Sequence, residues 1–568
     1  MQSEAKNFKF QDNAVPELRF THEGGTQQFS FKSSGACFIT IPEVYKTWIS
    51  ITKVEHRADE SIVEVATTAY DGQVINEGSI NLFCLDEQVE VSILQTPKYV
   101  IFKDLFFEEF VLEHFDKDGD GKISSEEAAQ ITEIDLSDYA ERRWITSVEG
   151  IEYMPYLKTL MLNDCDDWGD YEDWEDISLT YLDVSHNQFL SILNCSWCGL
   201  TALDLSHNTA LTWLQCNENQ LTALDLSQNT ALTKLDCGDN QLTTLDLSQN
   251  TALTYLWCGS NQLTTLDLSQ NTALTYLWCG SNQLTTLDLS QNTALTELHC
   301  GFNQLTTLDL SHNTALTYLW CGSNQLTTLD LSHNTALTYL WCGEKQLTVL
   351  DLSHNTALTE LYCLGNQLTT LDLSHNTALT KLSCVGNQLT VLDLSHNTAL
   401  TYLGCWSNQL TALDLSHNTA LTRLQCGDNQ LTTLDLSHNT ALTRLQCGDN
   451  QLTTLDLSHN TALTELWCGE NQSTALNLSQ NTALTKLWCK KNQLTTLDLS
   501  HNTALTELGC WDNQLTSLDL TKNKELKSLY IDQNPQLRFV YVGSDFDEKN
   551  VDLKKDDSTQ IVKVDYII

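Results

Sequence analysis

The sequence has little of what marks several large classes of protein. Only 5 of its 568 residues are Pro and 3 are Met, and its 30 Lys and Arg are outnumbered by 74 Asp and Glu, for a net charge of −44. A chain this acidic would repel nucleic acid and anionic membrane surfaces, so neither is an expected partner. No apolar run approaches the roughly 18 residues of a membrane-spanning helix, and we expect no membrane-spanning segment.

Catalytic signatures are missing as well. The sequence contains no G-x-S-x-G, H-E-x-x-H, phosphate-binding P-loop or dinucleotide-binding fingerprint. Its repeated carboxylates are copies of one another, whereas a catalytic site needs particular side chains in a particular geometry. We therefore expect a protein that is not an enzyme.

What the sequence has in abundance is one unit of 21 residues, which recurs from about residue 179 to residue 513. In Leu242–Gln262, LTTLDLSQNTALTYLWCGSNQ, the phrase L-x-x-L-x-(L/C)-x-x-N occurs twice. Units of this length stack as the coils of a solenoid, because none can bury its apolar side alone. Two phrases per coil predict a strand on each side of every coil. The expected fold is therefore mainly β, a solenoid with two parallel sheets.

The same unit predicts which side chains are buried. Sixteen of the 20 Cys recur every 21 residues from Cys195 to Cys510, at the third inward position of the second phrase. We interpret them as a stack of buried thiols, because in-register neighbours on parallel strands present parallel Cβ vectors that suit a disulfide poorly. The Asn that ends each phrase, such as Asn250, is expected to bond the turn backbone of a neighbouring coil.

Residues 1–98 predict a small β-sandwich, because short alternating runs are separated by Gly, Asp, Glu and Pro. The order of features resembles the BACON domains of Bacteroidetes surface proteins; the matching elements are Gly24-Gly25, FSFKSSG, Trp48-Ile49, Val63–Val65 and EGSINLFCLDEQVEVSILQ. Glu77 departs from this family, which more often has a basic residue there. The resemblance implies a spacer or, alternatively, a glycan-binding module. Cys37 and Cys84 could pair, and the sequence leaves that open.

Residues 116–127, DKDGDGKISSEE, match the twelve-residue EF-hand loop and predict Ca2+ as a cofactor. The expected ligands are the carboxylates of Asp116, Asp118 and Asp120, the carbonyl of Lys122, the side chain of Ser124 directly or through water, and both oxygens of Glu127. The alternative is an acidic loop that holds no ion. Because only one such loop is present, we expect a structural clamp within an N-terminal cap, residues 99–133, rather than a regulatory switch.

The two phrases differ in how much their outward residues vary. In the first phrase these positions repeat as Thr, Ala or Val, then Asp, then Ser, whereas in the second phrase they change freely from coil to coil. We therefore predict that the second phrase forms a ligand-binding face. Its candidate residues are Tyr255, Trp257, Tyr276, Trp278, His299, Tyr318, Trp320, Tyr339, Trp341 and Tyr362. Such aromatic rings offer flat faces to sugars or anchors to a protein. Alternatively, they stack along the sheet and only stabilise it.

A second regular array consists of His residues at the turn after the first phrase, in eight successive coils from His312 to His459. These side chains could bind transition metals or respond to acid. Gln occupies the same position in other coils, such as Gln249 and Gln270. A solvated polar turn is therefore the favoured interpretation.

The nested 21-residue pattern closely resembles the bacterial leucine-rich repeats with a cysteine ladder, of the internalin J type, over about 370 residues. This resemblance implies an extracellular or cell-surface, adhesin-like protein that recognises a protein, mucin or glycan on a host or cell surface. It carries over no catalytic residue. The alternative is a structural rod or scaffold without a dedicated ligand.

The expected organisation follows from these assignments. A β-sandwich (1–98) precedes the calcium-loop cap (99–133), the solenoid (134–534) and a C-terminal cap (535–568). The first residues, MQSEAKNFKFQDN, contain no apolar core of a signal peptide. An extracellular location therefore presumes that such a signal has been removed. We expect a monomer.

Overall fold

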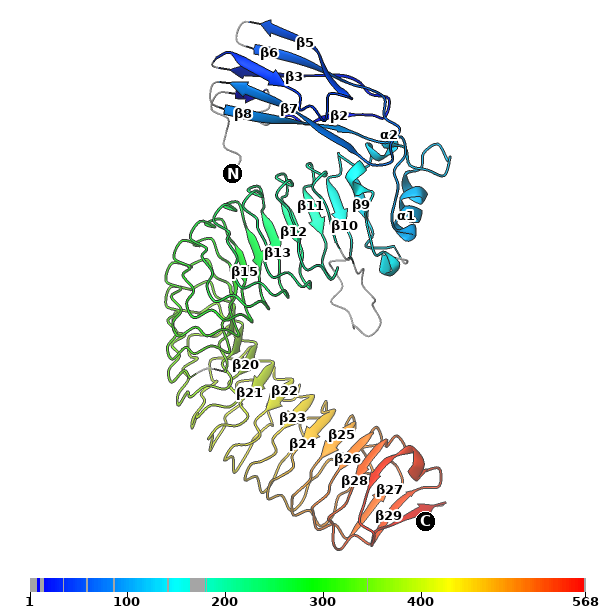
Figure 1. The fold of residues 1–568 in the computed structure, drawn as a ribbon. Helices are drawn as coiled ribbons and strands as arrows, with labels where there is room; N and C mark the ends of the chain where they lie inside the picture. The colour runs from blue at the N-terminus through cyan, green and yellow to red at the C-terminus, as the bar shows by residue number, and fades with distance from the viewer. Residues whose placement is uncertain are drawn as a thin grey trace. The chain divides into compact units, whose positions relative to one another are not determined.

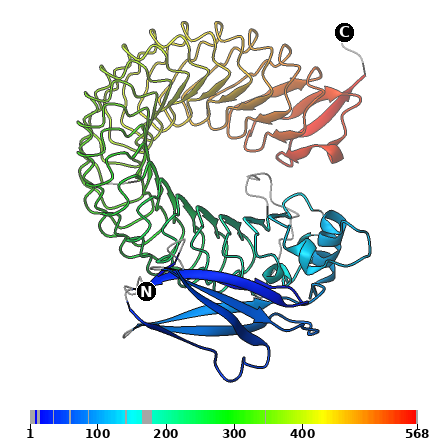
Figure 2. The same cartoon turned by 90° about the horizontal axis from the view of Figure 1, so that it is seen from above.

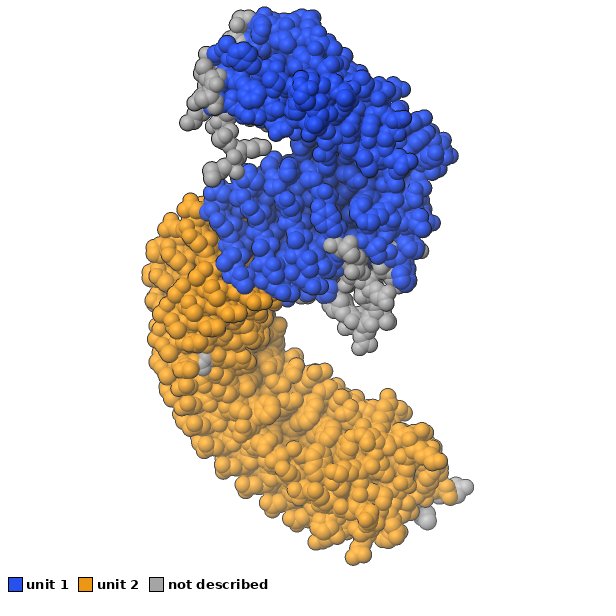
Figure 3. Space-filling model, in the orientation of Figure 1, with its two compact units in different colours: residues 1–252 blue, residues 253–568 orange. Residues whose placement is uncertain are grey.

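In a computed structural model of the chain, the described residues are 8–10, 15–33, 35–57, 60–84, 87–139, 142–163, 179, 181–344 and 346–565. They fall into two compact units, residues 1–252 and 253–568 (Figure 3). The fold is mainly β and about 4% helical, with a parallel-sheet solenoid of about 18 turns that follows small β-sheets and a few short helices (Figure 1). The mainly β, parallel-sheet solenoid predicted from the repeat is thus confirmed.

The first unit begins with two four-stranded sheets. One has the order β1 (Phe8–Phe10), β3 (Gly25–Ser33), β6 (Glu60–Thr67), β5 (Ile49–Arg57); the other has the order β2 (Leu18–Phe20), β8 (Glu87–Gln95), β7 (Asn76–Cys84), β4 (Cys37–Thr40). Inward residues of both sheets, including Phe31, Val63 and Val91, form one buried cluster. The alternating runs therefore form a β-sandwich. Cys37 and Cys84 lie opposite each other on β4 and β7 as free thiols.

Short helices lead from the sandwich into the solenoid: α1 (Leu105–Phe115), α2 (Ser125–Ala128), η1 (Arg142–Trp144) and η2 (Ile151–Tyr153). Asp104 caps α1, because one carboxylate oxygen accepts from the N–H groups of Phe106 and Phe107. Its other oxygen accepts from the N–H and hydroxyl of Thr146. One carboxylate thus joins the helix before the acidic loop to the segment that enters the first coils. No helix in the described part of the chain is long and apolar enough to cross a membrane.

The second phrase of each coil forms a three-residue strand in a parallel, in-register ladder. In the first unit the strands are β9 (Glu133–Asp135), β10 (Thr159–Met161), β11 (Ile192–Asn194), β12 (Trp213–Gln215) and β13 (Lys234–Asp236). In the second unit they are β14 (Tyr255–Trp257), β15 (Tyr276–Trp278), β16 (Glu297–His299), β17 (Tyr318–Trp320), β18 (Tyr339–Trp341), β19 (Glu360–Tyr362), β20 (Lys381–Ser383), β21 (Tyr402–Gly404), β22 (Arg423–Gln425), β23 (Arg444–Gln446), β24 (Glu465–Trp467), β25 (Lys486–Trp488), β26 (Glu507–Gly509), β28 (Ser528–Tyr530) and β30 (Asp552–Lys554). Within this unit the strands lie along the inner side of the stacked coils (Figure 2).

The interior of each coil contains the predicted residues. The repeated Leu and Cys side chains are buried, and the sixteen Cys from Cys195 to Cys510 are free thiols, as expected. Burial raises the pKa of Cys279 to about 12, so the thiol stays protonated and unreactive. The Asn ladders are also confirmed. Asn292 Nδ2 donates to the carbonyls of Leu268 (3.1 Å) and Asn271 (2.9 Å), and Asn303 Nδ2 donates to that of Cys279 (3.0 Å).

Among the described residues, the second expected sheet forms only at the C-terminal end. There β27 (Ser517–Leu520), β29 (Phe539–Gly543) and β31 (Gln560–Val564) pair in parallel, next to the turn η3 (Glu548–Asn550). In the earlier described coils the first phrase keeps the predicted in-and-out burial but forms no strand. The repeated Asp accepts a hydrogen bond from the N–H two residues later, as Asp288 does from Ser290 (2.9 Å). β27 makes the same turn, because Asp519 accepts from the N–H of Thr521 (2.9 Å), and it still pairs with β29.

Candidate binding face and metal loop

The candidate binding face is built on β14 to β19. In each of these strands the middle Leu points inward, and the two flanking side chains lie outward, half-buried or, at His299, buried. We call the outward residues before and after that Leu the first and the second column. The first column contains Tyr255, Tyr276, Glu297, Tyr318, Tyr339 and Glu360; the second contains Trp257, Trp278, His299, Trp320, Trp341 and Tyr362.

Neighbouring rings of one column stack face to face. In the first column, Tyr255 and Tyr276 have ring centroids 4.4 Å apart and planes within 9°, and Tyr318 and Tyr339 are 4.1 Å apart and within 4°. Burial raises the pKa of Tyr318 and of Tyr339 above the ordinary value, which keeps both hydroxyls protonated. These spacings fall slightly below the distance of about 4.8 Å between paired strands, so the register itself brings the rings into contact.

The second column stacks in the same way. The rings of Trp257 and Trp278 lie 4.6 Å apart and within 8°, and those of Trp320 and Trp341 lie 4.7 Å apart and within 9°. Within a stacked pair the facing surfaces are covered, so the outward surface consists largely of ring edges and polar tips. The stacking proposed as the alternative from sequence is therefore present. The flat faces expected for sugar rings are not free within these pairs.

Both columns are interrupted at β16, where Glu297 and His299 replace Tyr and Trp. The His299 ring stacks on Trp278 (4.5 Å, 2°) and on Tyr318 (4.6 Å, 25°), so it crosses from the second column to the first. Its side chain is buried, its Nδ1 has no hydrogen-bond partner, and burial lowers its pKa to about 4. His299 is therefore neutral near pH 7. Trp320 is tilted by 57° from His299 and does not continue the stack.

Beyond the aromatic strands, charged residues of both signs occupy most of the corresponding positions. Ion pairs join Lys381 to Glu360 (2.9 Å), Arg444 to Glu465 (3.4 Å) and Lys486 to Glu507 (2.8 Å). Arg423 lies over the ring of Tyr402 at 5.5 Å. The face thus changes along the solenoid from stacked rings to paired charges.

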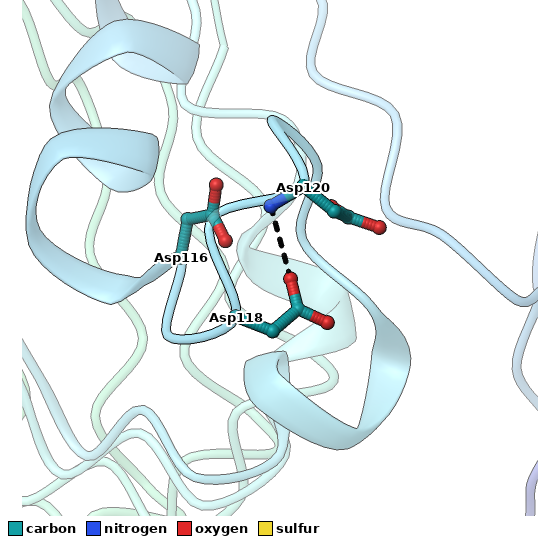
Figure 4. Close-up of side chains that lie close together, drawn as sticks. All are labelled: Asp116, Asp118 and Asp120. Carbon is teal, nitrogen blue, oxygen red and sulfur yellow. Dashed lines mark hydrogen bonds between the residues drawn. The ribbon is translucent and has the colours of Figure 1, made fainter.

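The acidic loop brings three of its six expected ligands together. Oxygen atoms of Asp116, Asp118 and Asp120 lie within 4.8 Å of one another (Figure 4). The Asp116 carboxylate accepts from the N–H groups of Gly119 (2.8 Å) and Gly121 (2.9 Å), and this folds the loop around it. Gly119 and Gly121 have φ of 73° and 80°, a conformation that Gly adopts without strain. The loop thus gathers carboxylate oxygens, the type of ligand that Ca2+ prefers, around one tight turn.

The other three expected ligands occupy the far end of the loop. Glu127 forms a capping box with Ser124 and also accepts from the N–H of Lys117 (3.0 Å), and these hydrogen bonds lower its pKa. The loop segment around Lys122 is fixed by an isolated bridge between Ser124 and Tyr99. An extended segment of the cap thus pairs with this loop, where a second EF-hand loop would pair with the first.

The histidine array lies where the sequence placed it. The eight side chains from His312 to His459 are exposed, and each ring Nδ1 lies 3.1–3.2 Å from the hydroxyl of the preceding Ser. This contact is local to each turn. Exposed side chains with only local contacts agree with the interpretation of this array as a solvated polar turn.

From the sequence, His299 and Phe302 interrupt the aromatic band, but the sequence assigned no role to that interruption. Phe302, in the loop that follows, is 51% exposed and has φ of 54°, which is unfavourable for a bulky side chain. The available signal was the coincidence of three departures from the repeat, at Glu297, His299 and Phe302, within a single coil.

Comparison with known proteins agrees with the repeat. A family described as "Leucine Rich repeats (2 copies)" matches residues 251–292 and 293–333, and one described as "Leucine Rich Repeat" matches residues 178–200. No curated protein matches the chain. The functional domain of InlJ from Listeria monocytogenes, which includes a cysteine ladder, is 34% identical over 75% of this chain and 77% of that one, with a TM-score of 0.48. YopM from Yersinia enterocolitica is 24% identical over 77% and 92%, with a TM-score of 0.59. The 21-residue coils, the buried cysteine ladder and the identity to InlJ together show that this chain belongs to the leucine-rich repeat family.

Proposed function

We propose that this protein is a non-enzymatic, adhesin-like binding protein that contacts its ligand through the strand face of the second phrase. The observation that carries the proposal is the unequal variation of the two phrases. The first keeps one Asp turn in coil after coil, whereas the strand face changes from stacked rings to paired charges. Stability alone requires no such change, because the buried Leu, Cys and Asn are the same in almost every coil.

A protein ligand fits this face better than a glycan does. Sugars pack on open ring faces, and within the Tyr and Trp pairs the facing surfaces are covered by neighbours at 4.1–4.7 Å. Ring edges, hydroxyls and ion pairs are groups that protein interfaces use. The resemblance of the repeats to the internalin J type implies a surface-exposed binding role outside the cell, and the 34% identity to the functional domain of InlJ agrees with that resemblance. Burial of the thiol ladder is compatible with an oxidising environment.

The second candidate is a structural rod, and the ring stacking favours it. Each stacked aromatic pair contributes about 0.5–1.5 kcal/mol beyond its burial, so the columns would stabilise the coils even without a ligand. The two roles are compatible, because a ligand can contact the edges of rings whose faces are stacked.

We further propose that Ca2+ binds Asp116, Asp118 and Asp120, with the Lys122 carbonyl, Ser124 and Glu127 completing the site. The residues fit the ion, because the donors are oxygens and Gly121 provides the turn. Bound calcium would neutralise the crowded carboxylates and clamp the cap. For the N-terminal sandwich we propose the spacer role that its resemblance to BACON domains implies.

The test is a binding screen in calcium against arrays of surface proteins, mucins and glycans. The protein is compared with a variant in which Trp278, Trp320 and Trp341 are all Ala. The matched control changes the opposite side of the same coils, with Asp267, Asp309 and Asp330 all replaced by Asn. Asn477 already occupies that position in one coil and accepts the same hydrogen bond from Ser479 (3.1 Å), so the control fold is preserved.

The expected result is a ligand that binds the native protein and the Asn variant but not the Ala variant, with circular dichroism unchanged. A ligand that binds the Ala variant equally well would contradict the proposed face. Loss of stability in the Ala variant, with no ligand found for the native protein, would favour the rod.

A further inference from the structure

Two cysteines of the β-sandwich face each other across neighbouring strands. In the register of β4 and β7, Cys37 is paired with Cys84, and both are free thiols. Side chains of directly opposite residues on antiparallel strands lie on the same face of the sheet, and their Cα atoms are about 4.5–5.5 Å apart. A disulfide spans Cα separations of about 4.4–6.8 Å. The backbone therefore places the two sulfurs where a bond between them can form.

The two thiols are also in contact. Burial raises the pKa of Cys84, and a hydrogen bond with the Cys37 thiol raises it further. A second hydrogen bond holds Cys37, whose Sγ donates to the Gly35 carbonyl (3.6 Å). Because a hydrogen bond between thiols requires adjacent sulfur atoms, no other side chain separates the pair. Closing the bond needs only a short approach of the two side chains.

An oxidant can reach one of the two sulfurs. β4 and β5 are edge strands of the two sheets, and a hollow beside them is lined by Cys37 together with Phe38, Ile51 and Val54. Cys37 is half-buried, whereas Cys84 has no exposed surface. A disulfide donor from solution therefore meets Cys37 first, and Cys84 lies opposite it to complete the exchange.

The cysteine ladder of the solenoid lacks these properties. Its thiols are buried, and burial raises the pKa of Cys279, Cys384 and Cys426 to about 12. Thiol–disulfide exchange needs a thiolate and access to the sulfur. Neighbouring ladder residues lie on parallel strands with parallel Cβ vectors, which suit a disulfide poorly. Oxidation should therefore distinguish the sandwich pair from the ladder.

We propose that Cys37 and Cys84 form a cross-strand disulfide in an oxidising environment and that this bond fastens β4 to its sheet. The oxidant is a disulfide donor, either a small molecule such as oxidised glutathione or a protein. The Cys37 thiolate attacks one donor sulfur and displaces the other as a thiolate, which leaves a mixed disulfide. The Cys84 thiolate then attacks Cys37 Sγ and displaces the second donor thiolate. The two protons lost by the cysteines end on the two released thiols, so the donor gains the two electrons that the protein loses.

The bond acts where the sandwich is held least. β4 has only four residues, lies at an edge and pairs with β7 alone, whereas β7 has nine residues and pairs on both sides. Short edge strands open more easily than central ones. A bond that closes the chain between Cys37 and Cys84 also reduces the conformational freedom of the unfolded state. We therefore expect oxidation to stabilise the sandwich. The site is independent of the strand face proposed to bind a ligand.

The experiment compares full-length protein treated with oxidised glutathione with protein kept in dithiothreitol. Each sample is denatured, alkylated and weighed by mass spectrometry. The reduced protein should have all 20 cysteines alkylated, and the oxidised protein two fewer. Peptides mapped without reduction should be joined through Cys37 and Cys84. Cys37→Ser, a change at a half-buried position, should abolish this link while circular dichroism stays unchanged.

The matched control is Cys198→Ser, which disrupts the closest spacing of cysteines in the sequence, Cys195-x-x-Cys198. Its hydroxyl can replace the thiol in both hydrogen bonds, from Asn163 Nδ2 (3.5 Å) and to the Ser196 carbonyl (3.4 Å). This variant should still form the Cys37–Cys84 link.

Calorimetry then tests the effect of the bond on the sandwich. Oxidation should raise the melting temperature of the sandwich by several degrees in the native protein and not in Cys37→Ser. The proposal is overturned if the oxidised protein keeps 20 alkylatable cysteines, or if the new link joins thiols of the ladder instead. It is also overturned if the linked sandwich melts no higher than the reduced one.

Discussion

A double-mutant cycle on two tryptophan pairs separates ring stacking from ordinary burial. Trp320 and Trp341 stack at 4.7 Å with planes within 9°, whereas Trp278 and Trp320 are separated by the β16 coil, with centroids 6.1 Å apart and planes 55° apart. The variants are the three single Ala substitutions and the two corresponding double substitutions. Because Trp320 belongs to both pairs, each cycle provides an internal reference for the other.

The expected coupling energies follow from these geometries. A well-stacked aromatic pair contributes about 0.5–1.5 kcal/mol beyond the burial of each ring, so we expect roughly 1 kcal/mol between Trp320 and Trp341. Between Trp278 and Trp320 we expect a smaller coupling, because their tilted rings lie toward the far end of the range of distances over which aromatic pairs interact. His299, which packs on Trp278, is retained in every variant.

The free energy of unfolding is measured by urea denaturation followed by circular dichroism, with the slope checked in each variant because repeat proteins can lose cooperativity. Equal coupling in the two pairs would refute the reasoning, since the columns would then act through general burial. A coupling near 1 kcal/mol only in the stacked pair would show that the rings stabilise neighbouring coils. The binding screen on the same variants would then show whether they also contact a ligand.

Three further predictions concern single sites. Calcium at about 100 times its dissociation constant should stabilise the cap by about 2.7 kcal/mol and raise its melting temperature. Glu127→Gln should abolish this rise. A melting temperature that does not change when calcium is removed by a chelator would exclude the clamp. Burial raises the pKa of Asp236 from 3.8 to about 7, so its folded state keeps a proton that the unfolded state releases, and stability is lost as pH rises from about 4 to 7. Asp236→Asn can still accept the hydrogen bond from Gly238, so above pH 7 its free energy of unfolding should exceed that of the native protein by on the order of 4 kcal/mol. At pH 4 the two proteins should be almost equally stable. A difference in urea denaturation that does not depend on pH would contradict this. Ser473 occupies a buried Leu position, and its hydroxyl donates to a Leu452 carbonyl that already accepts from the N–H of Gln472. Ser473→Leu should therefore raise the free energy of unfolding by roughly 1–3 kcal/mol. A lower melting temperature of this variant would indicate that the site is too small for Leu.

The interior of the coils could be predicted from the sequence almost residue by residue. Leu268, Cys279 and Asn292 lie where the period of 21 residues places them, because every coil offers each inward position the same neighbours. The clustering of Asp116, Asp118 and Asp120 could also be predicted, because it depends on the spacing within twelve consecutive residues. Calcium at this loop stays a prediction.

For the first phrase, the prediction from the repeat was only partly correct. Alternating burial was correct, but a second sheet along the whole solenoid was wrong, because burial alternation does not specify where each N–H donates. The Asp288 carboxylate takes the Ser290 N–H within its own coil. β27 makes the same bond, from the Thr521 N–H to Asp519, and still pairs with β29, so this turn alone does not decide where a ladder forms.

The sequence by itself therefore determined the coil, its buried thiols and Asn ladders, and which of the two phrases varies. Those properties depend on contacts that every repeat makes in the same way. Only the tertiary structure decided what the variable residues do. The stacking of Tyr and Trp and the crossing of His299 between columns depend on rings about 21 residues apart in the sequence coming within about 5 Å. Side-chain packing alone sets the angles between those rings.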